Sequence, residues 1–164
     1  MRCAPTGRPI ASSPATKLRR VSRYTSLVPI RWSDMDAYGH VNNVQFLTYL
    51  EEARIDMFQS IAEEMRSGVL VANSSIRYLR PLVHRHRPVP IDVWVTKVGG
   101  ASFNLAYEVH DEGGSIVYAR ARSLMVPYDF ARARPRRLSP TERVFLDAYL
   151  GPDVIVDQPV GARA

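Results

Sequence analysis

The sequence contains very little cysteine and no long apolar run. Its single cysteine, Cys3, has no partner within the chain, which excludes a scaffold of intrachain disulfides and a cysteine-based metal cage. No apolar stretch approaches the roughly 18–20 residues that a membrane-spanning helix needs. A chain of 164 residues buries enough surface to fold without such cross-links. These absences predict one globular domain that is soluble and cytoplasmic.

The chain also lacks an excess of charge outside its first residues. The formal net charge is +6, but six of the 22 Lys and Arg residues lie within residues 1–23, which contain no Asp or Glu. The rest of the chain carries 16 basic and 16 acidic residues. A neutral body argues against nucleic-acid binding, because that binding depends on basic surface. We therefore expect neither nucleic acid nor membrane as a partner.

Residues 1–23 are rich in Pro, Ser, Thr and Arg and show no periodic apolar pattern. This composition predicts a disordered basic tail, and it lacks the apolar stretch of a secretory signal. An organelle transit peptide has a similar composition and stays an alternative, as does an early start codon. Residues 151–164 are expected to form a C-terminal tail. The predicted domain therefore covers residues 24–150.

Apolar residues between positions 42 and 68 recur at spacings near three, four and seven, with acidic residues on the opposite face. This periodicity indicates an amphipathic helix. Asn42 or Asn43 is a natural N-cap, and Gly68 is a natural stop. The pattern predicts one helix of about 24 residues, roughly 36 Å long.

The remaining pattern is that of strands, expected at residues 24–32, 69–79, 91–96, 103–109 and 115–128, with a short helix at 140–150. Two Gly-Gly breaks separate the last three strands, which indicates antiparallel hairpins. With one helix and five strands, a sheet that curls around the helix buries one face of each. The predicted fold class is α+β. A second copy would cover the exposed sheet edges, so we expect a homodimer or homotetramer.

A polar motif, Asp34-Met35-Asp36-Ala37-Tyr38-Gly39-His40-Val41-Asn42-Asn43, lies between the first strand and the helix, and Glu51-Glu52-Ala53-Arg54 follows it. With these residues the chain resembles the 4-hydroxybenzoyl-CoA-type thioesterases from about residue 24 to 150. Tyr78-Leu79-Arg80-Pro81 and the arginine-rich residues 135–138 also look like that family. The resemblance implies a hotdog fold, a five-stranded antiparallel sheet curled around one long central helix. It also implies an enzyme that hydrolyses acyl-CoA thioesters without a cofactor, acyl-carrier protein being possible as the thiol carrier.

Thioester hydrolysis needs a base or nucleophile at the carbonyl carbon and donors at the carbonyl oxygen. Asp36 precedes the helix, whose first N–H groups have no partner within the helix. The resemblance gives the carboxylate role to Asp36 and the oxyanion-binding N–H to Asn43. It also matches His40 to a histidine thought to assist catalysis in plant-type members. Asp36 could be nucleophile, general base or only a helix cap, and His40 could instead hold the loop by hydrogen bonds.

Substrate contacts are expected from Tyr38 and Gly39 in the loop, where glycine lets the backbone approach the substrate. Two basic clusters, residues 84–87 and 132–137, are candidates for binding the phosphates of coenzyme A, and we assign this role to Arg85 and Arg87. His84 and His86 lack a third ligand, so no metal site is expected. Asp34 is expected to be a solvated loop or strand-end residue.

Two other functions remain open at the level of the sequence. A hydratase or dehydratase acting on acyl thioesters would pair His40 with Glu51 or Glu52 on the helix. A non-catalytic acyl-CoA-binding protein would leave Asp36 with only a capping role. The position of Asp36 immediately before the helix favours hydrolysis over both.

Overall fold

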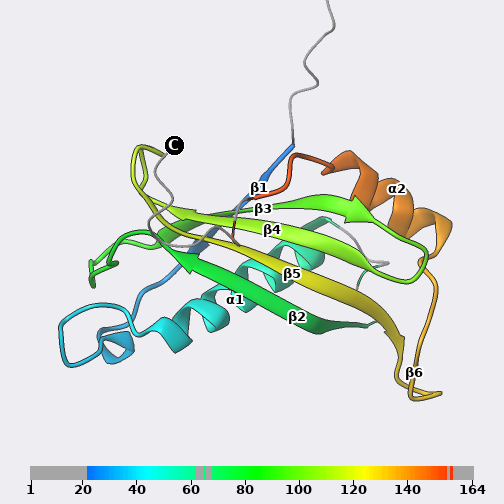
Figure 1. Ribbon diagram of the computed structural model, residues 1–164, viewed down its shortest axis with the longest axis horizontal. Helices are drawn as coiled ribbons and strands as arrows, with labels where there is room; N and C mark the ends of the chain where they lie inside the picture. The colour runs from blue at the N-terminus through cyan, green and yellow to red at the C-terminus, as the bar shows by residue number, and fades with distance from the viewer. Residues whose placement is uncertain (1–21, 62–64, 66–67, 155, 157–164) are drawn as a thin grey trace, which may run out of the picture.

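The computed structural model describes residues 22–61, 65, 68–154 and 156. Its elements are β1 (Tyr24–Val28), the 3-10 turn η1 (Trp32–Asp34), α1 (Asn43–Ile61), β2 (Val69–Tyr78), β3 (Val89–Val98), β4 (Phe103–His110), β5 (Val117–Asp129), β6 (Arg134–Pro135) and α2 (Pro140–Ala148). The long strands follow the order β1-β3-β4-β5-β2, with every neighbouring pair antiparallel. Figure 1 shows α1 lying along one face of this curved sheet. The arrangement is the predicted hotdog fold.

The hairpins β3–β4 and β4–β5 confirm the antiparallel pairing predicted from the two Gly-Gly breaks. At the second hairpin, Asp111 accepts the N–H of Ile116 at 2.7 Å through its side chain. Gly114 turns the chain there with a φ of 68°, a conformation that L side chains rarely adopt. Local turn chemistry therefore sets the register of the sheet against which α1 packs.

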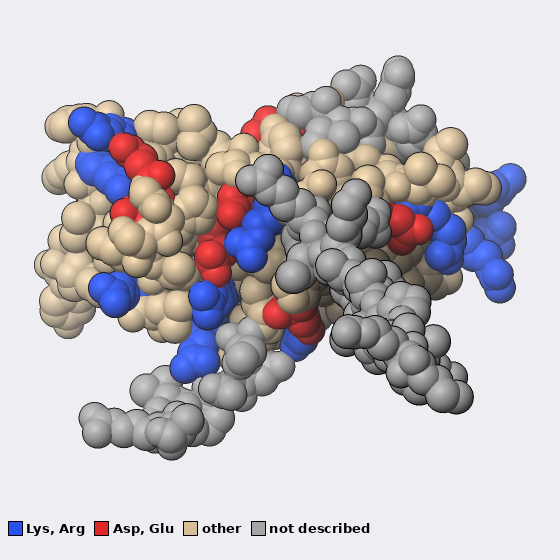
Figure 2. All heavy atoms as spheres, turned by 90° about the horizontal axis from the view of Figure 1, so that it is seen from above, with Lys and Arg blue, Asp and Glu red and all other residues tan. Residues whose placement is uncertain are grey.

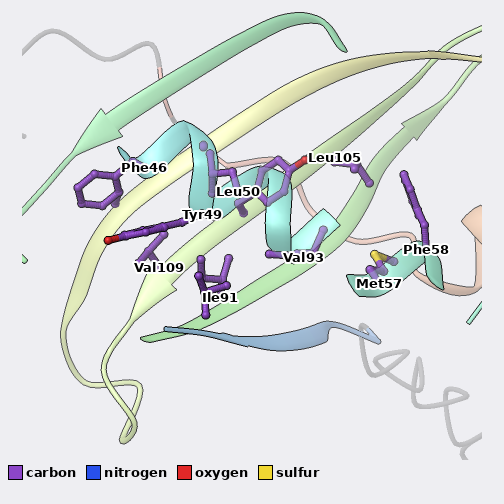
Figure 3. Close-up of a cluster of buried hydrophobic side chains, with 14 of the residues drawn as sticks. Phe46, Tyr49, Leu50, Met57, Phe58, Ile91, Val93, Leu105 and Val109 are labelled. Carbon is purple, nitrogen blue, oxygen red and sulfur yellow. The ribbon is translucent and has the colours of Figure 1, made fainter. Parts of the chain in front are cut away.

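The core lies between α1 and the concave face of the sheet. The helix contributes Tyr49, Leu50 and Met57, each 2 % exposed or less, and the sheet contributes Ile91 and Leu105, which are fully buried. Figure 3 shows these side chains pointing toward one another from the helix and the strands. Burying an aliphatic or aromatic side chain of this size stabilises the fold by about 1.5–3 kcal/mol. This packing fixes the position of the helix and of the loop that precedes it.

One strand, β1, is shorter than the sequence predicted, and the structure describes only part of the predicted long helix. β1 ends at Val28 rather than at residue 32, because Pro29 has no N–H for a sheet and the chain then enters η1. α1 ends at Ile61 and has 19 residues, whereas the predicted helix extended to Gly68. Residues 62–64 and 66–67 of that prediction lie outside the described residues, as do residues 1–21 of the predicted tail.

α2 begins with a capping box in which Ser139 and Glu142 exchange hydrogen bonds with each other's backbone N–H groups. Glu142 is 1 % exposed and pairs with Arg136 at 2.7 Å. Burial opposes ionisation of Glu142, but the bonds from Arg136 and Ser139 hold its pKa below the usual value. After α2, the Trp94 indole donates to the carbonyl of Pro152 at 2.7 Å. The segment following α2 thus lies against β3.

Figure 2 shows, on one face of the molecule, several patches in which acidic and basic side chains lie next to one another. On the sheet, Glu108 pairs with Arg120 at 2.8 Å and with Arg23 at 3.5 Å. Such pairing agrees with the neutral body expected from the sequence. Within the described part of the chain, none of the helices is long and apolar enough to span a membrane.

Candidate active site

Residues 35–41 form a closed loop between η1 and α1. Met35 and Val41 pair as an antiparallel bridge, and the N–H of Asp36 donates to the carbonyl of His40 at 2.7 Å. The N–H of Val41 donates to the carbonyl of Leu82 at 2.7 Å, which ties the loop to the segment after β2. Gly39 has a φ of 76°, so the turn requires a residue without a Cβ. The loop is held by its backbone at both ends.

Asp36 is oriented by this loop. Its Oδ1 accepts the N–H of Tyr38 at 2.8 Å and the N–H of His40 at 3.0 Å. No hydrogen bond from a described residue reaches Oδ2, and the residue is half-buried at the wall of a pocket. One carboxylate oxygen is therefore fixed by the backbone, and the other is available to a substrate or water.

The start of α1 presents a backbone hydrogen-bond donor to the same pocket. The side chain of Asn42 caps the helix by accepting the N–H of Val44 at 3.1 Å. Asn43, the first helical residue, makes no hydrogen bond through its N–H to any residue that the structure describes. A first-turn N–H favours negative charge beside it. Both Asp36 and Asn43 line the same pocket.

This pocket has a volume of about 290 Å³ and is lined on its far side by the end of β2. The hydroxyl of Tyr78 donates to the carbonyl of Asn43 at 3.0 Å, and its ring packs edge-on against Phe46 with the ring centroids 5.2 Å apart. Burial raises the pKa of Tyr78, which keeps its hydroxyl a neutral donor. The lining consists of Asp36, His40, Val41, Asn43, Phe46, Tyr78, Leu79, Arg80, Pro81 and Leu82.

Asp34 differs from the prediction of a solvated residue, because it is only 2 % exposed. Its Oδ2 accepts the hydroxyl of Tyr49 at 2.6 Å and the N–H of Arg31 at 2.9 Å. Burial would raise its pKa, but the bonds from Tyr49 and Arg31 outweigh burial and hold the pKa below the usual value. Asp34 thus anchors the base of the loop from inside the fold.

The other predicted loop residues lie at different distances from the pocket. His40 lines it, and its side chain makes no hydrogen bond to any described residue. Tyr38 is 85 % exposed and is absent from the lining. Gly39 lines a neighbouring hollow of about 590 Å³, which also contains Asp36 and Val83. Asp36 therefore stands between two hollows.

Arg85 and Arg87 lie further along the segment between β2 and β3, in a third hollow of about 370 Å³. Arg87 pairs with Glu112 at 3.2 Å. The Nε and Nη2 atoms of Arg85 are buried without a hydrogen-bond partner among the described residues. His84 borders both this hollow and the one beside Gly39. The two arginines thus stand at the end of a row of hollows that begins at Asp36.

The remaining candidates are placed elsewhere. Glu51 pairs with Arg54 at 3.4 Å, and neither Glu51 nor Glu52 lines the pocket of Asp36. In the second basic cluster, Arg132 pairs with Asp129 at 3.2 Å, and Arg136 with the buried Glu142. Within the described ranges, no group of three or more His, Cys, Asp and Glu side chains could hold a metal ion.

A family profile described as the thioesterase-like superfamily matches residues 30–148, which include the loop, α1 and the pocket. The chain belongs to this superfamily. Among solved structures of similar proteins, a thioesterase from Thermus thermophilus, complexed with coenzyme A and Zn, is 30 % identical. The match covers 76 % of this chain and 92 % of that one, with a TM-score of 0.66.

Two further proteins show how far the likeness extends. The fold matches that of a predicted thioesterase from Bacillus stearothermophilus with a TM-score of 0.72, at 22 % identity, over 81 % of this chain and 100 % of that one. The uncharacterized protein YsmA of Bacillus subtilis is 34 % identical over 83 residues. That match covers 49 % of this chain and 56 % of YsmA, so it spans little more than half of that relative.

Proposed function

We propose that this member of the superfamily is an enzyme that hydrolyses acyl-CoA thioesters to the free acid and coenzyme A. The observation that carries the proposal is that Asp36 and Asn43, the first residue of α1, line one pocket. One Asp36 oxygen is fixed by two backbone N–H groups, and the other has no partner among the described residues. A thioester carbonyl between these groups would meet a carboxylate at carbon and a donor at oxygen.

In this mechanism the thioester oxygen accepts the N–H of Asn43 as negative charge develops on it. Asp36 then acts as nucleophile, forming an anhydride that water cleaves, or as general base, removing a proton from the attacking water. Either route releases the coenzyme A thiol and needs the ionised carboxylate. His40 lines the same pocket, and its imidazole assists by donating a proton to the leaving thiolate.

The row of hollows supports a path for the coenzyme A portion of the substrate. It begins at Asp36, passes Gly39 and His84, and ends at Arg85 and Arg87. Arg85 has donors without a partner among the described residues, and guanidinium groups bind phosphate oxygens well. The solved Thermus relative contains coenzyme A. We therefore propose that Arg85 and Arg87 bind the phosphates of coenzyme A, whereas substrate contact by the exposed Tyr38 stays a prediction.

The assembly proposed for this enzyme is a homodimer or homotetramer that uses β2. This strand lies at the edge of the sheet, and its Leu70 and Val71 are 40 % and 43 % exposed. On α1, Val44 and Leu47 are 67 % and 48 % exposed. A second copy adding its own β2 would cover an unpaired strand edge and these apolar side chains together.

Hydration or dehydration fits the site less well. That chemistry would pair His40 with Glu51 or Glu52, but the pocket of His40 contains neither glutamate. Glu51 is instead paired with Arg54. Hydrolysis needs only groups that line the pocket.

The test is release of thiol from a panel of short, long and aromatic acyl-CoAs by the wild type and by Asp36→Asn. We expect turnover by the wild type that falls by at least ~100-fold in the variant, the usual loss on removing an essential acid–base group. The matched control is Asp111→Asn, another turn aspartate that accepts a backbone N–H, and it should retain wild-type turnover. Tight acyl-CoA binding without turnover of any substrate would instead indicate a non-catalytic acyl-CoA-binding protein.

A further inference from the structure

Another pocket, separate from the three hollows described above, lies between the C-terminal half of α1 and the start of β2. Its volume is about 530 Å³, within the range of small-molecule sites. Ile55, Phe58, Met65 and Val69 form apolar walls, and Arg54 supplies a charged group. No residue of this pocket lines the pocket of Asp36.

Arg54 is a buried cation with few partners. It is 8 % exposed, and its guanidinium contacts Glu51 at 3.4 Å and the hydroxyl of Tyr107 at 3.5 Å. Both distances are long for charge-assisted hydrogen bonds, which prefer about 2.7–2.9 Å. The Glu51 side chain is 59 % exposed, so water screens its charge. A buried guanidinium with five N–H donors is therefore only partly satisfied by the described residues.

The sheet holds Arg54 in place without neutralising it. Tyr107 is fully buried on β4, and burial raises the pKa of its hydroxyl. Tyr107 consequently stays neutral and supplies no counter-charge. The pocket therefore combines apolar walls with a buried cation whose anionic partner, Glu51, lies 3.4 Å away and is largely exposed to water, which suits a ligand with an apolar body and a terminal carboxylate.

The position of this pocket relates it to the active site through a second copy of the chain. Val69 of the pocket begins β2, and Tyr78 of the Asp36 pocket ends it. When two copies of a strand pair antiparallel across a two-fold axis, the start of each strand lies beside the end of the other. The proposed dimer would thus bring the Arg54 pocket of one copy toward the Asp36 pocket of the other.

We propose that the Arg54 pocket of one copy binds the distal end of the acyl group hydrolysed at Asp36 of the other, and that Arg54 selects acyl groups ending in a carboxylate. This inference rests on the proposed thioesterase function. It identifies the preferred substrates as half-thioesters of dicarboxylic acids. A free fatty acid has the same chemistry, and the experiments below distinguish the two sources.

The first experiment compares kcat/KM for sebacoyl-CoA and decanoyl-CoA, which have the same chain length and differ in the distal carboxylate. We expect the wild type to prefer sebacoyl-CoA, and Arg54→Met to reduce the sebacoyl/decanoyl ratio by about 10–100-fold, the loss typical of one charge-assisted bond. Arg54→Lys should keep part of the preference. Arg120→Met is the matched control, because Arg120 pairs with Glu108 on the sheet, and its ratio should equal that of the wild type.

Ile55→Glu tests the pocket without removing the buried arginine. Ile55 is 43 % exposed and lines the pocket, so the new carboxylate is tolerated and competes for Arg54. The sebacoyl/decanoyl ratio should fall in this variant as well. Hydrolysis of decanoyl-CoA with no preference for sebacoyl-CoA in the wild type would overturn the inference and leave the thioesterase function standing. Hydrolysis of neither substrate, nor of any other acyl-CoA, would overturn both.

The placement across two copies is tested by mixing subunits. Co-expression of Asp36→Asn and Arg54→Met chains gives mixed dimers. In such a dimer the Arg54→Met chain supplies an intact Asp36, which faces the intact Arg54 of the Asp36→Asn chain. These dimers should recover the sebacoyl preference that dimers of Arg54→Met lack. No recovery would overturn the placement across copies.

Binding of free decanoate, measured by calorimetry, distinguishes a fatty-acid site from substrate selection. If the wild type shows no preference for sebacoyl-CoA but binds decanoate, and Arg54→Met does not bind it, the pocket is a site for free fatty acid and substrate selection is overturned.

Discussion

Asp34 and Asp36 are two residues apart in the same loop, yet their surroundings are opposite. Asp34 is 2 % exposed, and both of its oxygens accept hydrogen bonds, from Tyr49 and Arg31. Asp36 is half-buried and uses only one oxygen, which accepts two N–H groups of its own loop. The two residues are at positions i and i+2, and in an extended chain such side chains point to the same side. The alternation of side chains therefore does not explain the contrast. It arises because Asp34 ends η1 beneath α1, whereas Asp36 begins the turn that reaches the pocket.

Under the proposed function, this contrast separates a residue that stabilises the fold from one that carries out chemistry within one motif. A buried carboxylate with hydrogen bonds to both oxygens contributes to the free energy of unfolding. A carboxylate held by one oxygen, with the other facing a pocket, is positioned for reaction. We therefore expect substitutions at the two aspartates to affect different measurements.

The largest effect on stability is expected for Asp34→Asn. This change removes the charge that binds Arg31 and Tyr49 and places an amide N–H₂ in a buried site, which should lower the free energy of unfolding by about 3 kcal/mol. Urea unfolding followed by circular dichroism measures it. Asp36→Asn should stay within about 1 kcal/mol of the wild type, because the amide oxygen can still accept both loop N–H groups. Equal losses in the two variants would break the comparison.

Tyr49→Phe should lower the free energy of unfolding by about 2 kcal/mol. It deletes the 2.6 Å bond to Asp34, and bonds to charged groups contribute about 1.5–3 kcal/mol. The ring itself stays packed in the core. The same urea assay applies, and the double variant Tyr49→Phe/Asp34→Asn should lose less than the sum of the single losses. Strict additivity would show that the two groups do not interact.

Gly39→Ala should cost about 1 kcal/mol, because a φ of 76° is unfavourable for a residue with a Cβ. No atom outside the adjoining residues lies within 4 Å of the added carbon, so the cost is one of backbone conformation alone. Thermal unfolding measures the change. A cost close to zero would mean that the turn adopts another conformation, and the position of Asp36 would then need revision.

The smallest expected effect is the pH dependence of the difference between wild type and Asp34→Asn. The pKa of folded Asp34 lies below its ordinary value of 3.8. Above that value the carboxylate is ionised in both states and its full contribution is present. As pH falls below it, the unfolded chain takes up the proton first, and the contribution is lost down to the folded pKa. Urea midpoints of the two proteins should converge below pH 3.8; a gap that widens there would contradict the assigned ionisation.

Features set by neighbours in sequence could be predicted. The Gly-Gly breaks predicted the hairpins, and Asn42 was recognised as a candidate helix cap. The burial of Asp34 was missed because its partner Tyr49 is fifteen residues away. The one local signal was Arg31, which pairs with Asp34 at i, i+3.

The far wall of the pocket was also missed as part of the site. Tyr78 meets Asn43 only because β2 returns beside the start of α1 after 35 residues. The sequence singled out residues 78–81 by resemblance alone and gave no reason to place them beside Asp36. It also could not show that Arg85 and Arg87 belong to a separate hollow, because the path of a proline-flanked loop depends on what it packs against.

The most direct test of the account is to measure kcat/KM and the free energy of unfolding together in Asp34→Asn and Asp36→Asn, using the best acyl-CoA substrate. The account predicts that Asp36→Asn loses roughly 100–10,000-fold in kcat/KM at nearly unchanged stability. Asp34→Asn should lose stability and retain most of its activity under conditions where it is folded. An Asp36→Asn variant within tenfold of wild type, or one that loses activity only as far as it unfolds, would contradict a catalytic role for Asp36.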